Sequence, residues 1–187
     1  MQACSRVGIN VFPWVRDFYP ELSRFDPDST VQLEKLIETF GENYLQSVTQ
    51  RYWIQPGGRA VNFLQKVYQM KSAVDLASDR HGCVELWQAN HFHIDLYGNY
   101  IPGLCTGLSI RHSDLGRVLP ASEYPILNIL AESGPGGLVD YASKFGYKIA
   151  HEYLNKCHLC QDIRKFLLRE KGMDTHELQP REFYAFI

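Results

Sequence analysis

The sequence lacks a long hydrophobic run, an excess of positive charge and a large set of cysteines. Its longest apolar stretch falls far short of the ~20 residues that a transmembrane helix needs, and no charged-then-apolar signal segment opens the chain. The formal net charge of −2 offers no basic footprint for a nucleic acid. We therefore expect a cytoplasmic protein without a membrane or nucleic-acid partner.

The composition is otherwise ordinary. Hydrophobic residues make up 45% of the 187 positions and charged residues 21%, values typical of a globular protein with a buried core. The sequence shows no internal repeat and no low-complexity segment. The length predicts one domain, or one and a half.

The five cysteines are an odd number, which a framework of disulfides alone would not favour. In a reducing compartment, grouped cysteines are more often metal ligands or catalytic thiols. Cys157 and Cys160 form a C-x2-C pair at the start of an amphipathic helix that the pattern predicts from His158 to Lys171. Two thiols cannot fill a tetrahedral sulfur site alone, so the pair needs further ligands.

The remaining cysteines lie upstream of this pair. Cys83 and Cys105 are separated by 21 residues, and 51 residues separate Cys105 from Cys157. We predict that Cys83, Cys105, Cys157 and Cys160 form one metal or cluster site in which their sulfurs converge. Cys4 is expected to stand apart. The exposed N–H groups and dipole of a helix start are expected to lower the thiol pKa of Cys157 and Cys160.

The first part of the chain alternates between strand and helix patterns, which is typical of an α/β layer or a partial barrel. Asp26 and Pro27 suit a helix start, and Gly41 suits a helix end. We predict a first domain over residues 1–75. Its predicted elements are a strand at 6–12, helices at 26–40 and 42–50, a strand at 51–54 and a helix at 60–70.

The second part, residues 76–187, is predicted as a separate α+β module. Gly98-Asn99 is a hairpin signal between alternating residues 91–97 and a return strand at 100–102. That return strand delivers Cys105 into a loop of small residues, through which backbone can approach a cluster closely. The other predicted elements are a strand at 83–87, helices at 122–132 and 138–145 separated by a Gly/Pro-rich break at 133–137, and the helix at 158–171.

Several polar residues are candidates for a second role. His91, His93 and Asp95 share one face of the hairpin, but an i to i+4 span of ~13 Å suits a polar, pocket-facing side better than a metal trio. We predict that a histidine of this face contacts a substrate. Asp95 and Arg59 are further candidates for a substrate pocket. Arg59 follows two glycines before a helix, where it could bind an anion, although a helix-initiating turn is the better explanation. The last helix carries basic residues that we interpret as a solvated face: Arg164, Lys165 and Arg169.

The hairpin and its cysteines resemble the opening of the SPASM/twitch extensions of radical S-adenosylmethionine (radical SAM) enzymes. In that family a cysteine precedes a hairpin glycine, a second cysteine follows the hairpin, and later cysteines complete an auxiliary 4Fe–4S cluster. Cys83, Gly98 and Cys105 match the first part of this pattern, and Cys157 and Cys160 match the later ligands. The resemblance implies the end portion of a partial (β/α) barrel, followed by a cluster-binding module of a β-hairpin and helices.

The chain departs from the family in two respects. The gap from Gly98 to Cys105 is longer than usual, and the sequence has no C-x3-C-x2-C run, the motif that holds the catalytic cluster and binds S-adenosylmethionine. The resemblance therefore implies the auxiliary part of such an enzyme, with the radical SAM region upstream or on a separate subunit, and a small-molecule or peptide substrate. The abrupt start on a predicted strand at 6–12 favours a fragment.

Two alternatives stay open for the cysteines. The first is a structural zinc site in an interaction module, which would use the same four ligands and have no redox role. The second is a thiol enzyme in which Cys157 is the nucleophile and Cys160 resolves the intermediate. No tryptophan or proline flanks that pair and no predicted strand leads into it, so the thiol enzyme ranks third.

Overall fold

The structure is a computed structural model that describes residues 6, 24–26, 29–52, 54–88 and 90–187. Contacts divide the chain into two compact units, the first ending at Ile54 and the second running from Gln55 to Ile187. This boundary falls earlier than the one predicted after residue 75. Within the described part of the chain, no helix is long and apolar enough to cross a membrane.

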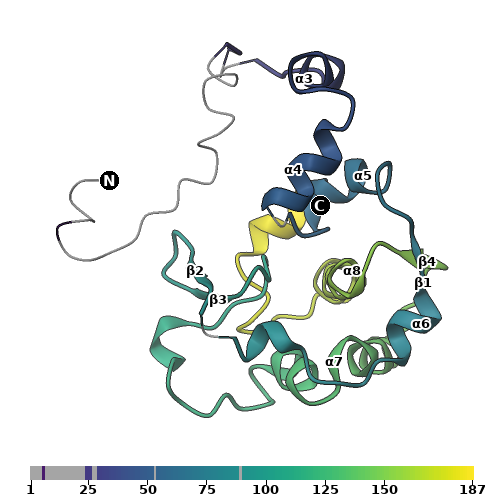
Figure 1. Cartoon of the computed structure of the whole chain (residues 1–187). Coiled ribbons are helices and arrows are strands. Elements are labelled where there is room, and N and C mark those ends of the chain that lie inside the picture. Colours follow the sequence, from purple (N-terminus) through teal and green to yellow (C-terminus); the bar gives the residue numbers. More distant parts are fainter. Residues whose placement is uncertain (1–5, 7–23, 27–28, 53, 89) are drawn as a thin grey trace. The chain divides into compact units, whose positions relative to one another are not determined.

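The first unit contains two described helices, α3 (Leu33–Phe40) and α4 (Tyr44–Tyr52) (Figure 1). As predicted, α3 ends at Gly41, which has a φ of 94° and donates its N–H to Ile37 O at 2.7 Å. The start predicted at Asp26 is wrong, because α3 begins at Leu33 after Gln32. The strand predicted at 51–54 is wrong, because α4 continues through Tyr52. The strand predicted at 6–12 lies outside the described residues apart from Arg6.

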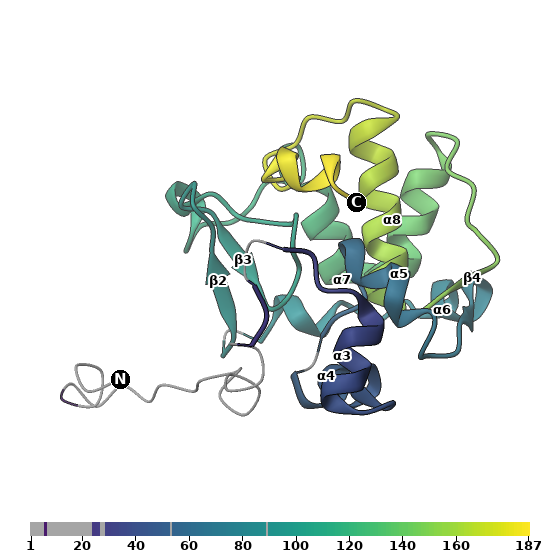
Figure 2. The ribbon, with the colours of Figure 1, turned by 90° about the horizontal axis from the view of Figure 1, so that it is seen from above.

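The second unit is built around α8 (Lys156–Arg169), which packs against α7 (Pro125–Ser143) and α6 (Ala73–Ser78). Figure 1 shows α8 near the centre of this unit, and Figure 2 shows α7 and α8 side by side. The predicted helix at the C-x2-C pair is confirmed. It begins after Asn155, whose side chain accepts the His158 N–H at 3.0 Å as an N-cap.

The core of the second unit lies between these helices. An i, i+4, i+8 stripe on α8 is buried against a matching stripe on α7, which excludes water from the seam. The fully or almost fully buried residues of the two stripes are Leu159, Ile163, Leu167, Ile126, Leu130 and Leu138. Each such side chain contributes roughly 1.5–3 kcal/mol of hydrophobic stabilisation.

The break predicted at 133–137 is confirmed as a kink within α7. Gly134 has φ 59° and ψ −162°, a backbone conformation almost restricted to glycine, and Pro135 follows it. Proline has no N–H to donate to the preceding turn, so the regular hydrogen bonding is interrupted there. The two halves of α7 correspond to the two predicted helices.

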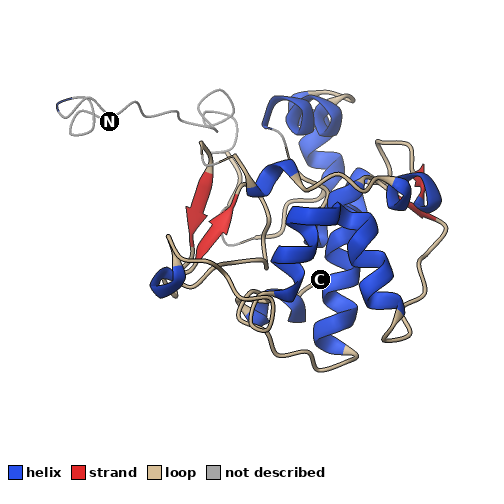
Figure 3. Ribbon diagram, turned by 90° about the horizontal axis from the view of Figure 1, so that it is seen from below, coloured by secondary structure: helices blue, strands red, loops and turns tan. Residues whose placement is uncertain are grey.

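The strands form two small antiparallel pairs (Figure 3). The predicted hairpin is confirmed as β2 (Phe92–Ile94) and β3 (Tyr100–Pro102), and β1 (Lys71–Ser72) pairs with β4 (Glu152–Tyr153). A partial barrel is not seen in the described residues. One reason is that the strand predicted at 51–54 is replaced by the end of α4. The strand predicted at 83–87, in the second module, is also wrong, since Val84–Leu86 forms the 3-10 turn η2.

Short helical turns complete the second unit. Gly58–Ala60 (η1) and Val61–Leu64 (α5) occupy the start of the helix predicted at 60–70. His112–Asp114 (η3) follows the hairpin, and Arg181–Ala185 (η4) lies near the C-terminus. The aromatic tail docks as predicted, because Tyr184 is only 1% exposed.

Glu177 is a buried carboxylate that joins the tail to α7. Its two carboxylate oxygens accept the N–H groups of Ile126 and Leu127, each at 3.0 Å, at the start of α7. A carboxylate suits this position, because the first N–H groups of a helix lack intrahelical partners. Burial nevertheless raises the pKa of Glu177 to about 7, from an ordinary value of 4.5.

We expect Glu177 to make the protein less stable as the pH rises. The folded state binds the carboxyl proton of Glu177 more tightly than the unfolded state. The resulting contribution to the free energy of unfolding is present below pH 4.5 and is lost as the pH rises through about 7. The shift corresponds to about 3 kcal/mol. Urea unfolding between pH 4 and 8 should show this decline in the native protein and a flatter profile in Glu177→Gln. Parallel profiles would contradict the assignment.

Candidate metal centre

Four cysteines line one cavity of about 470 Å³ in the second unit. They are Cys83, Cys105, Cys157 and Cys160, the four that the sequence groups together, and all are free thiols with partial exposure. They come from three separate segments, namely the start of η2, the loop after β3 and the first turn of α8. Cys4, which was expected to stand apart, lies outside the described residues.

The kink in α7 positions Cys83. The carbonyl groups in the last turn of a helix are available to outside donors, and Leu130 lies in the last turn before the kink. The Cys83 N–H donates to Leu130 O at 2.7 Å. The preceding residue must be glycine, since a Cβ on Gly82 would lie 2.1 Å from Ala131 O. Backbone contact with α7 therefore holds Cys83 at the cavity.

A tight loop positions Cys105. The Cys105 N–H donates to Pro102 O at 3.0 Å, and the Cys105 carbonyl accepts the Leu108 N–H at 2.9 Å. The loop also packs closely against the C-terminal turn, because a Cβ on Gly107 would lie 2.4 Å from the ring of Phe183. The small residues that the sequence shows here thus permit close packing around Cys105.

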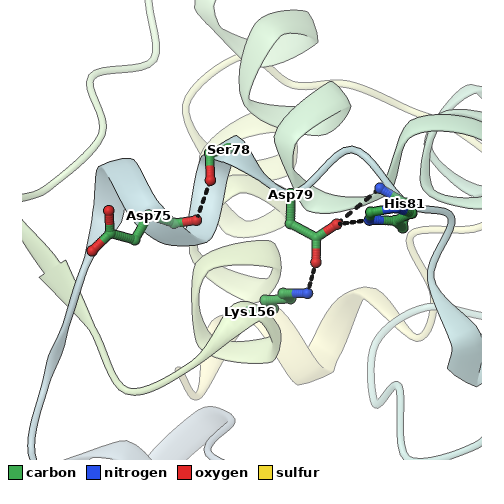
Figure 4. A network of polar contacts seen from close by, with 5 residues as sticks. All are labelled: Asp75, Ser78, Asp79, His81 and Lys156. Atoms are coloured by element: carbon green, nitrogen blue, oxygen red, sulfur yellow. Dashed lines mark hydrogen bonds and ion pairs between the residues drawn. The ribbon is translucent and has the colours of Figure 1, made fainter.

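A polar network joins the loop before Cys83 to the start of α8 (Figure 4). The Asp79 carboxylate lies between two partners and contacts the Lys156 ammonium with one oxygen. Its other oxygen accepts the backbone N–H of His81 at 2.9 Å and lies 2.8 Å from His81 Nδ1. Lys156 directly precedes Cys157, so the network links two cysteine-bearing segments.

The pKa values of Cys83, Cys105 and Cys157 are raised, which makes these thiols more basic than the sequence suggests. Burial raises the pKa of Cys157 to about 12, and the proximity of Cys160 and Cys83 adds to this effect. Burial also raises the pKa of Cys83 and Cys105. The expectation that the helix start would lower the pKa of Cys157 is therefore wrong for the protein alone, because desolvation outweighs the helix dipole. A bound cation would offset this penalty, since metal binding displaces the thiol protons.

Arg164 lies beneath the cysteines and also lines the cavity. It is only 4% exposed, so its assignment to a solvated helix face is wrong. Its Nη1 donates to Thr106 O at 3.1 Å and to Tyr184 Oη at 2.9 Å. The sequence contained a signal for this placement, because Arg164 follows Cys160 by four residues and therefore shares its helix face.

The charge of Arg164 has no carboxylate partner within salt-bridge distance among the described residues. Its Nε is buried and makes no hydrogen bond within the same part of the chain. A thiolate at Cys160 would interact favourably with the guanidinium. A buried cation beside four thiols suits a ligand set that carries net negative charge when deprotonated.

The spacing of the cysteine sulfurs is wider than that of a closed zinc site. In the described residues, the three-residue group of His, Cys, Asp or Glu whose ligand atoms all lie within 4.8 Å of one another is Asp114, Glu123 and His176, and no cysteine belongs to such a group. Four thiolates around one zinc, with Zn–S of ~2.3 Å, would lie only ~3.8 Å apart. No three sulfurs of the described cysteines therefore lie as close together as four ligands around one zinc would require.

The group of Asp114, Glu123 and His176 was not predicted from the sequence. His176 Nδ1 lies 3.2 Å from Glu123 Oε2, and Asp114 accepts the Tyr124 hydroxyl at 2.6 Å. The three residues come from separate segments without a spacing motif, so the sequence gives no signal for them.

The residues predicted to contact a substrate lie elsewhere. The described residues that line the cysteine cavity do not include His91, His93, Asp95 or Arg59. His91 and His93 are exposed, with their Nε2 atoms 3.0 Å apart. Asp95 instead accepts the N–H groups of Tyr97 and Asn99 and so stabilises the hairpin turn.

Arg59 lines a different cavity of about 190 Å³, together with residues of α8. A substrate contact by any of these four residues stays a prediction.

Comparison with known proteins gives no relative for this chain. No protein-family model, no curated protein and no solved structure matches it.

We expect the kink at Gly134 to be required for the position of Cys83. In Gly134→Ala, a Cβ would lie 2.2 Å from His81 O and occupy a glycine-only conformation. Strain of this kind costs about 1–3 kcal/mol, and the clash adds to it. Urea unfolding should show the loss, and hydrogen exchange at the Cys83 amide should accelerate.

Gly146→Ala is the matched control, because Gly146 also has a positive φ of 88° but its Cβ would meet nothing within 4 Å. It should lose only about 1–2 kcal/mol and leave exchange at Cys83 unchanged. Equal effects of the two substitutions would show that the contact with His81 O is unimportant.

Proposed function

We propose that this chain is the auxiliary 4Fe–4S cluster-binding part of a radical SAM-type enzyme, with Cys83, Cys105, Cys157 and Cys160 as the cluster ligands. The observation that carries the proposal is the convergence of four free cysteines, from three distant segments, on one cavity that also contains a buried arginine. The order of these cysteines around a hairpin supports the assignment to the SPASM/twitch type.

The proposal assigns the radical-generating step to another region. The chain has no C-x3-C-x2-C run, so S-adenosylmethionine would bind to an upstream region or a separate subunit. Residues 1–75 would then belong to the end of the partial barrel that precedes such extensions. A cluster bound here would relay electrons or bind the substrate of the partner region.

The residues of the chain would hold and shield this cluster. The leucines that line the cavity, including Leu104, Leu108 and Leu130, would limit the access of water. Both backbone contacts already described, at Cys83 and Cys105, would fix the ligands before the cluster binds. Such fixed ligand geometry lowers the entropic cost of binding, because little further ordering is needed.

A structural zinc site is the second candidate, because zinc accepts the same four thiolates. A closed zinc site would require the cysteines to move closer together, because no three of their sulfurs in the described residues lie within 4.8 Å of one another. The supply of ligands from single cysteines on two loops, rather than from two short-spaced pairs, favours the larger cluster.

Metal analysis separates the two candidates. We expect protein purified without oxygen, from cells supplied with iron, to be brown and to contain about four irons per chain. Its broad visible absorption should bleach on reduction. A colourless anaerobic preparation that contains one zinc and no iron per chain would refute the cluster proposal and support the structural zinc site.

Loss of one ligand should destabilise the loaded protein. Cys105→Ser is expected to reduce bound iron and to lower the melting temperature, because the site joins the hairpin loop to α8 across 51 intervening residues. Cys4→Ser, outside the predicted ligand set, is the control and should keep both values. Equal iron contents and melting temperatures for the two variants would remove Cys105 from the site.

A further inference from the structure

Arg164 is a buried cation with no salt-bridge partner in the described residues, and the Glu177 carboxylate interacts with it only through space. Arg164 is 4% exposed, and none of the carboxylates in the described residues forms a salt bridge with it. The two acceptors of its Nη1, Thr106 O and Tyr184 Oη, are neutral. An unpaired buried charge is strongly unfavourable, so a protein that retains one has a compensating anion in its working state.

The cysteine cavity is where that anion would bind. Arg164 lines the cavity together with Cys83, Cys105, Cys157 and Cys160. Its unpartnered Nε is still available as a donor, and a Cys160 thiolate would interact favourably with the guanidinium. A cluster held by four thiolates carries net negative charge, which would complement the guanidinium.

We propose that Arg164 is the charge-balancing residue of this centre, which retains the metal-loaded thiolates and raises the reduction potential of the cluster. The claim about the reduction potential rests on the proposed function, because it requires a cluster. The claim about charge balance applies to any metal held by the four cysteines. Reduction adds negative charge to the cluster, so a nearby cation stabilises the reduced form more than the oxidised form.

The other charged residues of the cavity are less suited to this role. Lys156 has a side chain that is 47% exposed and is paired with Asp79. Glu85 also lines the cavity, but its charge would oppose a negative cluster. Arg164 therefore supplies the internal positive charge, and its bond to Thr106 O simultaneously holds the loop that carries Cys105.

The test uses three variants of the whole chain. Arg164→Gln removes the charge, Arg164→Lys retains it, and Lys165→Gln removes one positive charge from the next residue. Lys165 is the matched control, because it lines two other cavities and not the cysteine cavity. Iron content and the reduction potential, from an anaerobic titration followed by absorption and electron paramagnetic resonance, are the measurements.

In Arg164→Gln we expect less bound iron and a shift of the potential of at least 59 mV to more negative values, which is a tenfold change in the ratio of reduced to oxidised cluster for one electron. Arg164→Lys should remain close to the native protein, and Lys165→Gln should be indistinguishable from it. An unchanged potential and iron content in Arg164→Gln would overturn the proposal.

Two further outcomes are also decisive. If Arg164→Gln does not fold, the Arg164→Lys variant decides. Loss of the cluster from Arg164→Lys, or a shift of its potential by at least 59 mV, would overturn the proposal, because it would show that the shape of the arginine side chain and not its charge matters. If the native protein contains zinc and no iron, the proposed function fails on its own. Zinc competition with a chelator then tests the charge, with at least tenfold weaker binding expected in Arg164→Gln and equal binding overturning the inference.

Discussion

The burial of α8 is the constraint on which the second unit depends. Leu159, Ile163 and Leu167 are excluded from water against α7, and this fixes the rotation of α8 about its own axis. With that rotation fixed, the neighbouring face of the helix, which carries Cys157, Cys160 and Arg164, must line the cavity. Hydrophobic packing on one face of α8 thus determines which side chains of the neighbouring face line the cavity. The placement of these three α8 residues therefore follows from core packing, whereas Cys83 and Cys105 depend on their own backbone contacts.

Much of this arrangement could be predicted from local patterns. The glycine-asparagine turn predicted the hairpin, the Gly/Pro-rich run predicted the break in α7, and the C-x2-C pair was correctly placed at the start of α8. These features depend on intrinsic backbone preferences, which act within a few residues. The grouping of Cys83 and Cys105 with the pair agrees with the shared cavity, although their spacing alone does not dictate it.

The failures arose where tertiary contacts override local preference. Residues 83–87 have an apolar pattern typical of a strand, but the bond from Cys83 to Leu130 O draws the segment onto α7 as a 3-10 turn. Arg164 was assigned to solvent by its residue type, since arginine is rarely buried without a partner. A helix start can be recognised in the sequence and predicts a lowered pKa for Cys157, whereas the burial that raises it depends on tertiary packing.

The docking of the tail has a consequence for biosynthesis. Tyr184 donates its hydroxyl to Gly107 O and contacts Arg164, so the loop around Cys105 is held by a residue that is translated 77 residues after Gly107. During synthesis, this loop cannot reach its final conformation until residue 184 has left the ribosome. If the site holds the proposed metal group, insertion before residue 184 has emerged would meet an unfinished site. The order of synthesis thus determines when the loop around Cys105 can fold, which the finished structure alone does not show.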